Sequence, residues 1–92
     1  MVPGGGEAGA VARDPRAHRW ALYAEAILKD SDAKVQRGET REAIKGYLKA
    51  ADIYLMLAEH EERYSEWQHY MSLADSCHRK VKQLIAQHKP IE

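Results

Sequence analysis

Apolar residues between positions 40 and 60 recur at alternating intervals of three and four residues, which is the period of an α-helix and not the alternation of a strand. They fall in two neighbouring lines along the predicted helix. The first line holds Ala43, Tyr47, Ala50, Tyr54 and Leu57, and the second holds Ile44, Leu48, Ala51, Leu55 and Ala58. Together the two lines make an apolar arc wider than the roughly 100° of an ordinary surface helix. We therefore expect this helix to contact two neighbours, or one neighbour and a binding partner.

The same period predicts a helix on each side of this segment, at 15–37 and at 64–88. The expected inward lines are Trp20, Ala24, Ile27, Ser31 and Val35 in the first of these, and Trp67, Tyr70, Ala74, Cys77, Val81 and Leu84 in the last. The three segments are similar in length and are joined by short links, which favours antiparallel neighbours. The sequence thus predicts an all-α, antiparallel three-helix bundle, related in shape to a tetratricopeptide repeat with one added helix.

Residues with known roles at helix ends mark the expected boundaries. Asp14 is suited to cap the first helix, with Pro15 at the first helical position, where a missing N–H costs nothing. Thr40 is expected to cap the second helix through its side-chain oxygen. Gly38, just before it, is expected to end the preceding helix with a positive φ angle.

The length of 92 residues fits a single domain with a modest core, which we assign to residues 14–89. Residues 1–13 contain four of the six glycines and show no helical or strand period. We expect this segment to be a flexible tail. Residues 90–92 are expected to be a tail or the start of a linker.

Composition narrows the classes of partner and the compartment. The 14 basic and 14 acidic residues cancel, which removes the general attraction to nucleic acid. No apolar run approaches the roughly 18 residues of a membrane span, and the N-terminus lacks the apolar core of a signal peptide. We expect no nucleic-acid partner and no direct membrane insertion. The single cysteine, Cys77, fits a reducing compartment, so we expect a cytoplasmic protein.

Residues that could carry chemistry form no strong catalytic or metal-binding pattern. The five histidines are His18, His60, His69, His78 and His88. None lies four residues from another histidine or from Cys77, the spacing of a preorganised metal site on a helix. Arg63 and His69 match the loose Arg-x(4–6)-His pattern of helical ribonucleases, in which the two side chains act on a scissile phosphate. Apart from that alternative, we expect no catalytic residue, no metal and no cofactor in this domain.

Several apolar residues remain beyond those that the three inward faces need. They are Leu22 and Ala26 in 15–37, Leu48 and Leu55 in 40–60, and Met71 and Leu73 in 64–88. A groove between two helices of a bundle can hold a further segment, either as a helix or as an extended peptide. Alternatively, each of these residues completes the core.

The segment VQRGETREAIKGYLKAADIYL resembles part of the MIT domain, the microtubule-interacting and trafficking module. The matching residues are Val35, Gly38, Glu42, Ala43, Tyr47, Ala50 and Tyr54. A tetratricopeptide repeat shares several of these positions, but it usually breaks with a proline near the position of Leu55. The last segment, MSLADSCHRKVKQLI, resembles the third MIT helix, especially the forms found on archaeal cell-division AAA ATPases. There Lys80, Val81 and Leu84 stand at matching positions.

The resemblance implies a non-catalytic peptide-binding module. Such a module recruits its parent protein, expected to be a AAA ATPase of cell division or vesicle trafficking, to the C-terminal tails of ESCRT-III-like filament proteins. It implies a groove between the 15–37 and 64–88 helices for an extended peptide, which we prefer, and an alternative groove between the 40–60 and 64–88 helices for an amphipathic helix. Mapped by helical geometry, the first groove uses Leu22, Tyr23, Leu73, Lys80 and Leu84, and the second uses Leu48, Leu55, Met71 and His78. The isolated domain is expected to be a monomer. The alternative is a tetratricopeptide-like adaptor or a self-associating helical protein.

Overall fold

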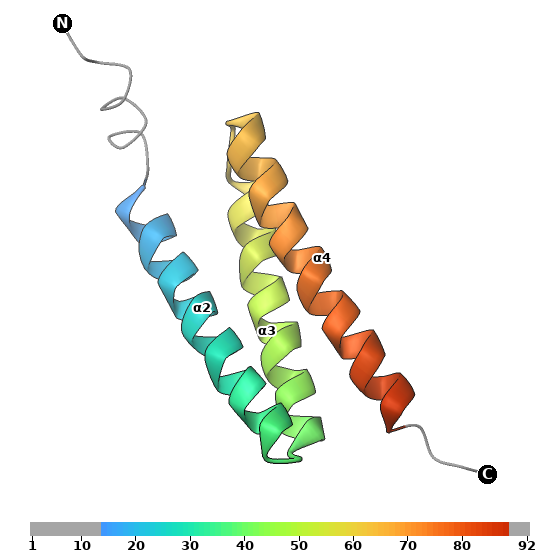
Figure 1. The fold of residues 1–92 in the computed structure, drawn as a ribbon. Helices are drawn as coiled ribbons and strands as arrows, with labels where there is room; N and C mark the ends of the chain where they lie inside the picture. Colours follow the sequence, from blue (N-terminus) through green and yellow to red (C-terminus); the bar gives the residue numbers. More distant parts are fainter. Residues whose placement is uncertain (1–13, 89–92) are drawn as a thin grey trace, which may run out of the picture.

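The computed structural model describes residues 14–88, which form three α-helices in chain order: α2 (Pro15–Gln36), α3 (Thr40–Glu59) and α4 (Tyr64–Gln87). Successive helices run in opposite directions (Figure 1). The expected all-α, antiparallel three-helix bundle is therefore confirmed, and each helix ends one residue earlier than the sequence pattern predicted. The expected tails at 1–13 and 90–92 lie outside the described residues.

The start of α2 and the link that follows it have the expected geometry. Asp14 caps the helix, since its Oδ1 accepts a hydrogen bond of 2.9 Å from the backbone N–H of Arg16. Pro15 occupies the first helical position. Gly38 has a φ of 79°, a left-handed conformation that glycine adopts without steric cost and that turns the chain from α2 into α3.

The expected cap of α3 by Thr40 is wrong. Thr40 is already the first helical residue, and the preceding Glu39 makes no capping hydrogen bond through its side chain. The Glu39 carboxylate instead pairs with Arg37, whose Nε lies 3.0 Å from Oε2. The Thr40 hydroxyl lies 3.0 Å from Nε2 of His88, at the end of α4. The physical reason is competition for the two side chains that could cap this helix: Arg37 binds the Glu39 carboxylate, and His88 contacts the Thr40 hydroxyl.

Helix α3 is the centre of the bundle. It packs along both other helices, whereas no Cα atom of α2 lies within 8 Å of a Cα atom of α4. Its buried residues are Ala43, Tyr47, Ala50, Ala51, Ile53, Tyr54, Leu57 and Ala58. Every alanine of α3 is among them, and small residues let neighbouring helices approach closely. The wide apolar arc of this segment is thus used, since α3 buries two sides against two neighbours.

The two tyrosines at the centre of α3 fill the space that separates α2 from α4. The Tyr54 ring stacks on Tyr70 of α4, with 6.5 Å between ring centroids. The Tyr47 hydroxyl donates a hydrogen bond to Asp32 of α2. Large rings between small residues therefore let one central helix support two outer helices that do not touch through their backbones.

Helices α2 and α3 approach each other closely at Ser31 and Gly46. Ser31 is almost completely buried, and its hydroxyl donates a hydrogen bond of 2.8 Å to the backbone carbonyl of Ile27. A Cβ atom added at Gly46 would lie only 1.9 Å from Ser31 Oγ. Glycine at this position is therefore required by the helix crossing and not by the backbone conformation.

Two tryptophans that the pattern placed on inward lines are partly exposed instead. Trp20 is 44% exposed and Trp67 is 39% exposed. Each packs beside a tyrosine of its own helix: Trp20 lies edge-on to Tyr23 with 5.8 Å between ring centroids, and Trp67 stacks on Tyr64 at 5.7 Å. Each indole ring therefore covers a flank of the bundle, and the buried rings in the helix interfaces are those of Tyr47, Tyr54 and Tyr70.

Candidate peptide-binding grooves

Most of the exposed large apolar side chains belong to α3 and α4. The described residues expose eight such side chains, and five of them are on this pair of helices: Leu48, Leu55, Tyr64, Trp67 and Ile85. Single exposed apolar residues are ordinary, whereas a contiguous set on one flank marks a surface that another molecule covers.

The pairing of residues between these two helices follows from helix geometry. Arg41 of α3 and Ile85 of α4 line the same hollow. The two helices are antiparallel and rise equally per residue, so seven residues forward along α3 match seven residues backward along α4. The pairs that result are Leu48 with His78 and Leu55 with Met71. We call this surface the outer groove, formed by Arg41, Leu48 and Leu55 on α3 and by Met71, His78 and Ile85 on α4.

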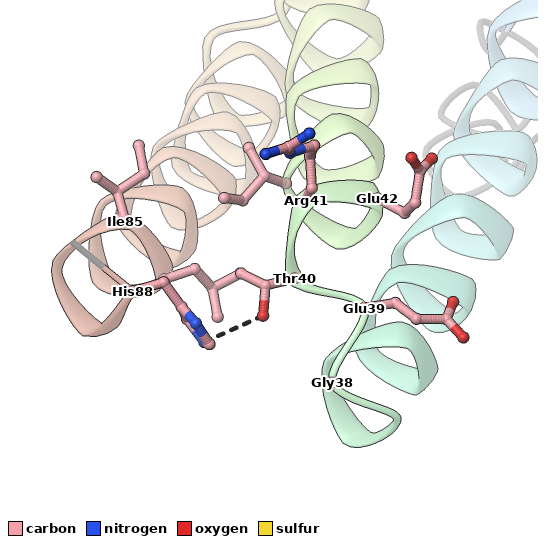
Figure 2. Close-up of a pocket in the computed structure, with 9 residues that line it drawn as sticks. Gly38, Glu39, Thr40, Arg41, Glu42, Ile85 and His88 are labelled. Atoms are coloured by element: carbon pink, nitrogen blue, oxygen red, sulfur yellow. Dashed lines mark hydrogen bonds between the residues drawn. The ribbon is translucent and has the colours of Figure 1, made fainter. Parts of the chain in front are cut away.

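The outer groove ends in a hollow of about 690 Å³ at the start of α3 and the end of α4. Its apolar lining comes from Ile44, Leu84 and Ile85. Figure 2 shows the contact between Thr40 and His88 that joins the two helices at the end of this hollow. The hollow offers space for one large apolar side chain beside charged groups.

Charges of opposite sign lie at the two ends of the outer groove. Arg41 is at the hollow, and Lys82, three residues before Ile85, is on the same part of α4. Asp52 and Glu59 each lie four residues after a groove leucine, towards the other end of α3. All four charged side chains are on exposed residues, and none has an ion-pair partner within residues 14–88. Glu39 and Glu42 also line the hollow, and each is paired with a basic residue, Arg37 or Lys45. The charges that have no such partner are thus basic at one end of the groove and acidic at the other.

The groove between α2 and α4 has a different character, because a polar bridge crosses it. A hollow of about 440 Å³ between these helices is lined by Asp32, Tyr47, Lys80 and Leu84 among others. Lys80 Nζ lies 3.5 Å from Asp32 Oδ1, the same oxygen that accepts the Tyr47 hydrogen bond. The ammonium also lies 5.2 Å from the centroid of the Tyr47 ring, within the range of a cation–π contact.

Burial and the Asp32 carboxylate also determine the protonation of groups beneath this bridge. Burial first, and then the hydrogen bond to Asp32 and its negative charge, raise the pKa of the Tyr47 phenol above its usual range. Burial raises the pKa of the Cys77 thiol, which is 2% exposed. Both groups therefore stay protonated near neutral pH, and Cys77 has the properties of a buried structural residue and not of a nucleophile.

The structure divides the five residues predicted for the α2–α4 groove. Lys80 and Leu84 line that groove. Leu73, two helical turns before Lys80, is partly buried against the core. Tyr23 lies elsewhere, because its ring packs against Trp20 and under Lys49 Nζ of α3, 5.3 Å from the centroid. Leu22 is 51% exposed. Tyr23 was therefore wrongly placed, since its position on α2 faces the flank shared with α3.

The residues predicted for the second groove are assigned to the outer groove by helical register alone, and this assignment stays a prediction for Leu48, Leu55, Met71 and His78. The sequence reasoning missed Arg41, Ile44 and Ile85, which complete its hollow. The sequence contained a signal for two of these residues, because Arg41 lies seven residues before Leu48 on α3 and Ile85 lies seven residues after His78 on α4.

The ribonuclease alternative named Arg63 and His69 as the residues that act on a phosphate. Arg63 Nε lies 3.0 Å from Oε2 of Glu61, and hydrogen bonds from Arg63 lower the pKa of that carboxyl group. His69 is exposed, with its ring 6.0 Å from the Tyr70 ring. Among residues 14–88, no three histidine, cysteine, aspartate or glutamate side chains are grouped to hold a metal ion. In the same range, no helix is long and apolar enough to cross a membrane.

Comparison with known proteins found no matching family model, no similar curated protein and no similar solved structure. The assignment to the MIT family therefore stays a prediction that rests on the residues quoted for it above. The geometry of the grooves is the evidence on which a function can be argued.

Proposed function

We propose that this domain is a non-catalytic peptide-binding module that holds an amphipathic helix in the outer groove. In the cell it would recruit its parent protein, a AAA ATPase, to the C-terminal tails of ESCRT-III-like filament proteins in the cytoplasm. The observation that carries the proposal is the row of exposed apolar side chains on α3 and α4, in the paired register described above. The partner named here comes from the resemblance to the MIT domain.

The outer groove fits a helix better than an extended strand. Its lining positions recur every seven residues on both walls, and four of the six are apolar, so a third helix can insert leucines spaced by three, four and seven residues between them. A contact of this kind is one helix long and falls in the class of small transient interfaces. We expect a dissociation constant of about 10 μM, which corresponds to about 7 kcal/mol.

The charges at the two ends of the groove specify the chemistry of the tail. A helix whose acidic residues lie beside Arg41 and Lys82 and whose basic residues lie beside Asp52 and Glu59 satisfies all four groups. The reverse orientation brings like charges together, which is unfavourable. The tail we propose is therefore a leucine-containing helix with an acidic end and a basic end.

The groove between α2 and α4 is the weaker candidate. A peptide that entered it would have to displace the ion pair between Lys80 and Asp32, or leave it buried beneath the peptide. Either event removes water or a partner from a charged group, which costs free energy that the outer groove does not require. We therefore prefer the outer groove for the tail.

A two-dimensional NMR titration with tail peptides of the ESCRT-III-like proteins of the same organism tests the proposal. Leu48→Asp changes a groove residue that is 41% exposed, and Leu22→Asp is its matched control, on α2 and 51% exposed. We expect shifts on α3 and α4. We expect Leu48→Asp to weaken binding at least about tenfold, as the loss of a buried leucine of about 1.5 to 3 kcal/mol predicts, while Leu22→Asp leaves it unchanged.

Three outcomes would contradict the proposal. The first is the absence of shifts at millimolar peptide. The second is an equal loss of binding in both variants, and the third is a mass that rises with protein concentration without peptide. That last result would favour the self-associating protein over the peptide-binding module.

A further inference from the structure

A second cluster of exposed aromatic residues lies away from the outer groove, on the flank formed by α2 and α3. We call it the aromatic patch, and it consists of Arg16, Arg19, Trp20 and Tyr23 on α2 and Lys49 on α3. Arg19, Trp20 and Tyr23 lie three, four and seven positions after Arg16, so the four residues share one side of the helix. Lys49 joins them from α3, with its Nζ 5.3 Å from the centroid of the Tyr23 ring.

The Trp20 ring lies between two shallow hollows. One, of about 390 Å³, is lined by Arg16, Arg19, Trp20 and Tyr23. The other, of about 280 Å³, has an apolar lining from Ala17, Met56 and Leu57 beside Trp20. The lining of the second hollow also includes Asp14, Arg16 and His60. An indole ring that borders both a cationic hollow and a partly apolar one is able to contact two successive side chains of different chemistry.

Positive charge exceeds negative charge around this patch. Arg16 has a partner, since its Nε lies 3.7 Å from Asp14 Oδ1. Arg19 and Lys49 have no carboxylate partner within the described part of the chain. Farther along the same flank the charges cancel, because Lys34 pairs with Asp30 at 2.9 Å. The excess positive charge is therefore local to the two aromatic rings.

We propose that the aromatic patch is a second peptide site, which takes an extended segment with acidic residues beside an apolar one. Carboxylates would pair with Arg19 and Lys49, and the apolar side chain would enter the hollow beside Met56. Arginine forms bidentate hydrogen bonds with carboxylates, and its flat cation also suits a site next to aromatic rings. This proposal is independent of the proposed function, because it concerns other residues on another flank.

The two hollows beside Trp20 favour an acidic peptide over a membrane surface or a nucleic acid strand. A membrane surface is flat and contacts protruding side chains, so it makes no use of hollows on both sides of an indole ring. A nucleic acid strand would need cations spaced along a path, whereas the charges here surround two rings on two helical turns. An acidic peptide uses both hollows and the cations together.

The chain offers one tryptophan per proposed site, which makes the test direct. Trp20 belongs to the aromatic patch, and Trp67 lies at the acidic end of the outer groove. The indole N–H signals of the two residues are assigned in an NMR spectrum with Trp20→Phe and Trp67→Phe. The probe is the synthetic peptide DELPELDE, at physiological salt, with a control peptide in which glutamine replaces every Asp and Glu.

We expect the acidic peptide to move the Trp20 indole signal and the Lys49 amide signal with a millimolar or lower dissociation constant. We expect the Trp67 signal to stay in place and the glutamine peptide to have no effect. Arg19→Glu should weaken binding at least about tenfold, as expected for a charge-assisted hydrogen bond, and the matched Lys29→Glu on the opposite side of α2 should not.

The proposal is overturned if DELPELDE moves no signal at millimolar concentration, if both peptides act alike, or if Arg19→Glu binds as the wild type does. Vesicles of phosphatidylserine and phosphatidylcholine and a single-stranded oligonucleotide are tested in parallel. Binding of either one that depends on Arg19, without binding of the acidic peptide, would assign the patch to that other partner and refute the peptide. Circular dichroism of each variant confirms that the helices remain.

Discussion

Replacing Gly46 by alanine tests the close crossing of α2 and α3, on which the bundle geometry depends. At an exposed position inside a helix, this change would stabilise the protein by about 1 kcal/mol, because alanine has the higher helix propensity. Here the new Cβ would lie 1.9 Å from Ser31 Oγ, 3.2 Å from Ser31 Cβ and 3.7 Å from Ile27 Cγ2. The structure therefore predicts the opposite sign.

The expected size of the effect follows from three contributions. Overpacking of a closely packed interface costs about 1 to 3 kcal/mol. Moving the buried Ser31 hydroxyl off the Ile27 carbonyl costs about 1 kcal/mol more, because that hydrogen bond is lost. The gain in helix propensity offsets about 1 kcal/mol. We expect Gly46→Ala to lower the free energy of unfolding by about 1 to 3 kcal/mol, or the melting temperature by roughly 4 to 8 °C per kcal/mol.

Urea unfolding followed by circular dichroism measures this change, and Ser31 supplies the control. Ser31→Gly removes both Ser31 atoms that the new Cβ would meet, and leaves only the ordinary contact with Ile27. In that background we expect Gly46→Ala to stabilise the protein by up to about 1 kcal/mol. The coupling between the two positions should then be about 1 to 4 kcal/mol. Stabilisation by Gly46→Ala in the wild-type background would refute the crossing as described.

Three smaller predictions concern other parts of the bundle. Tyr47→Phe should lower the free energy of unfolding by about 1 kcal/mol in urea titrations, because it removes the hydrogen bond to Asp32. An equal effect in an Asp32→Ala background, which has no acceptor at this position, would contradict that bond. Cys77 is buried with a raised pKa, so Ellman's reagent should modify it slowly in the native protein and rapidly in urea; rapid native modification would show that the thiol is accessible. Gly38→Ala should lower stability by about 1 kcal/mol because φ is 79°, and Ser31→Gly should not rescue it; an unchanged melting temperature would contradict the positive φ.

The period of the apolar residues was sufficient to predict the three helices, because each helix has one or two sides that must be buried. The two lines on α3 correctly indicated a helix with two neighbours. The start of α3 was harder to predict, because a threonine suited to capping was bound to His88, a residue far away in the sequence. Such competition between local and distant partners is not visible in a pattern of neighbouring residues.

The candidate sites were predictable only where helical register determines them. Leu48 and Leu55 could be paired with α4 because antiparallel helices repeat together every two turns. The sequence could not decide whether Tyr23 lies in the groove between α2 and α4 or on the flank between α2 and α3. The orientation of α2 against α3 decides this, and it is not visible in the sequence pattern. The ion pair of Asp32 with Lys80 was also unpredictable, because it joins helices that are not in backbone contact.

The central claim is that the outer groove holds a helix in one orientation, and paramagnetic NMR tests it most directly. A nitroxide is attached to either end of a tail peptide that has one acidic and one basic end. We predict that the label at the acidic end broadens signals around Arg41 and Ile85, and that the label at the basic end broadens signals around Glu59. Broadening confined to α2, or equal broadening from both labels, would contradict the account.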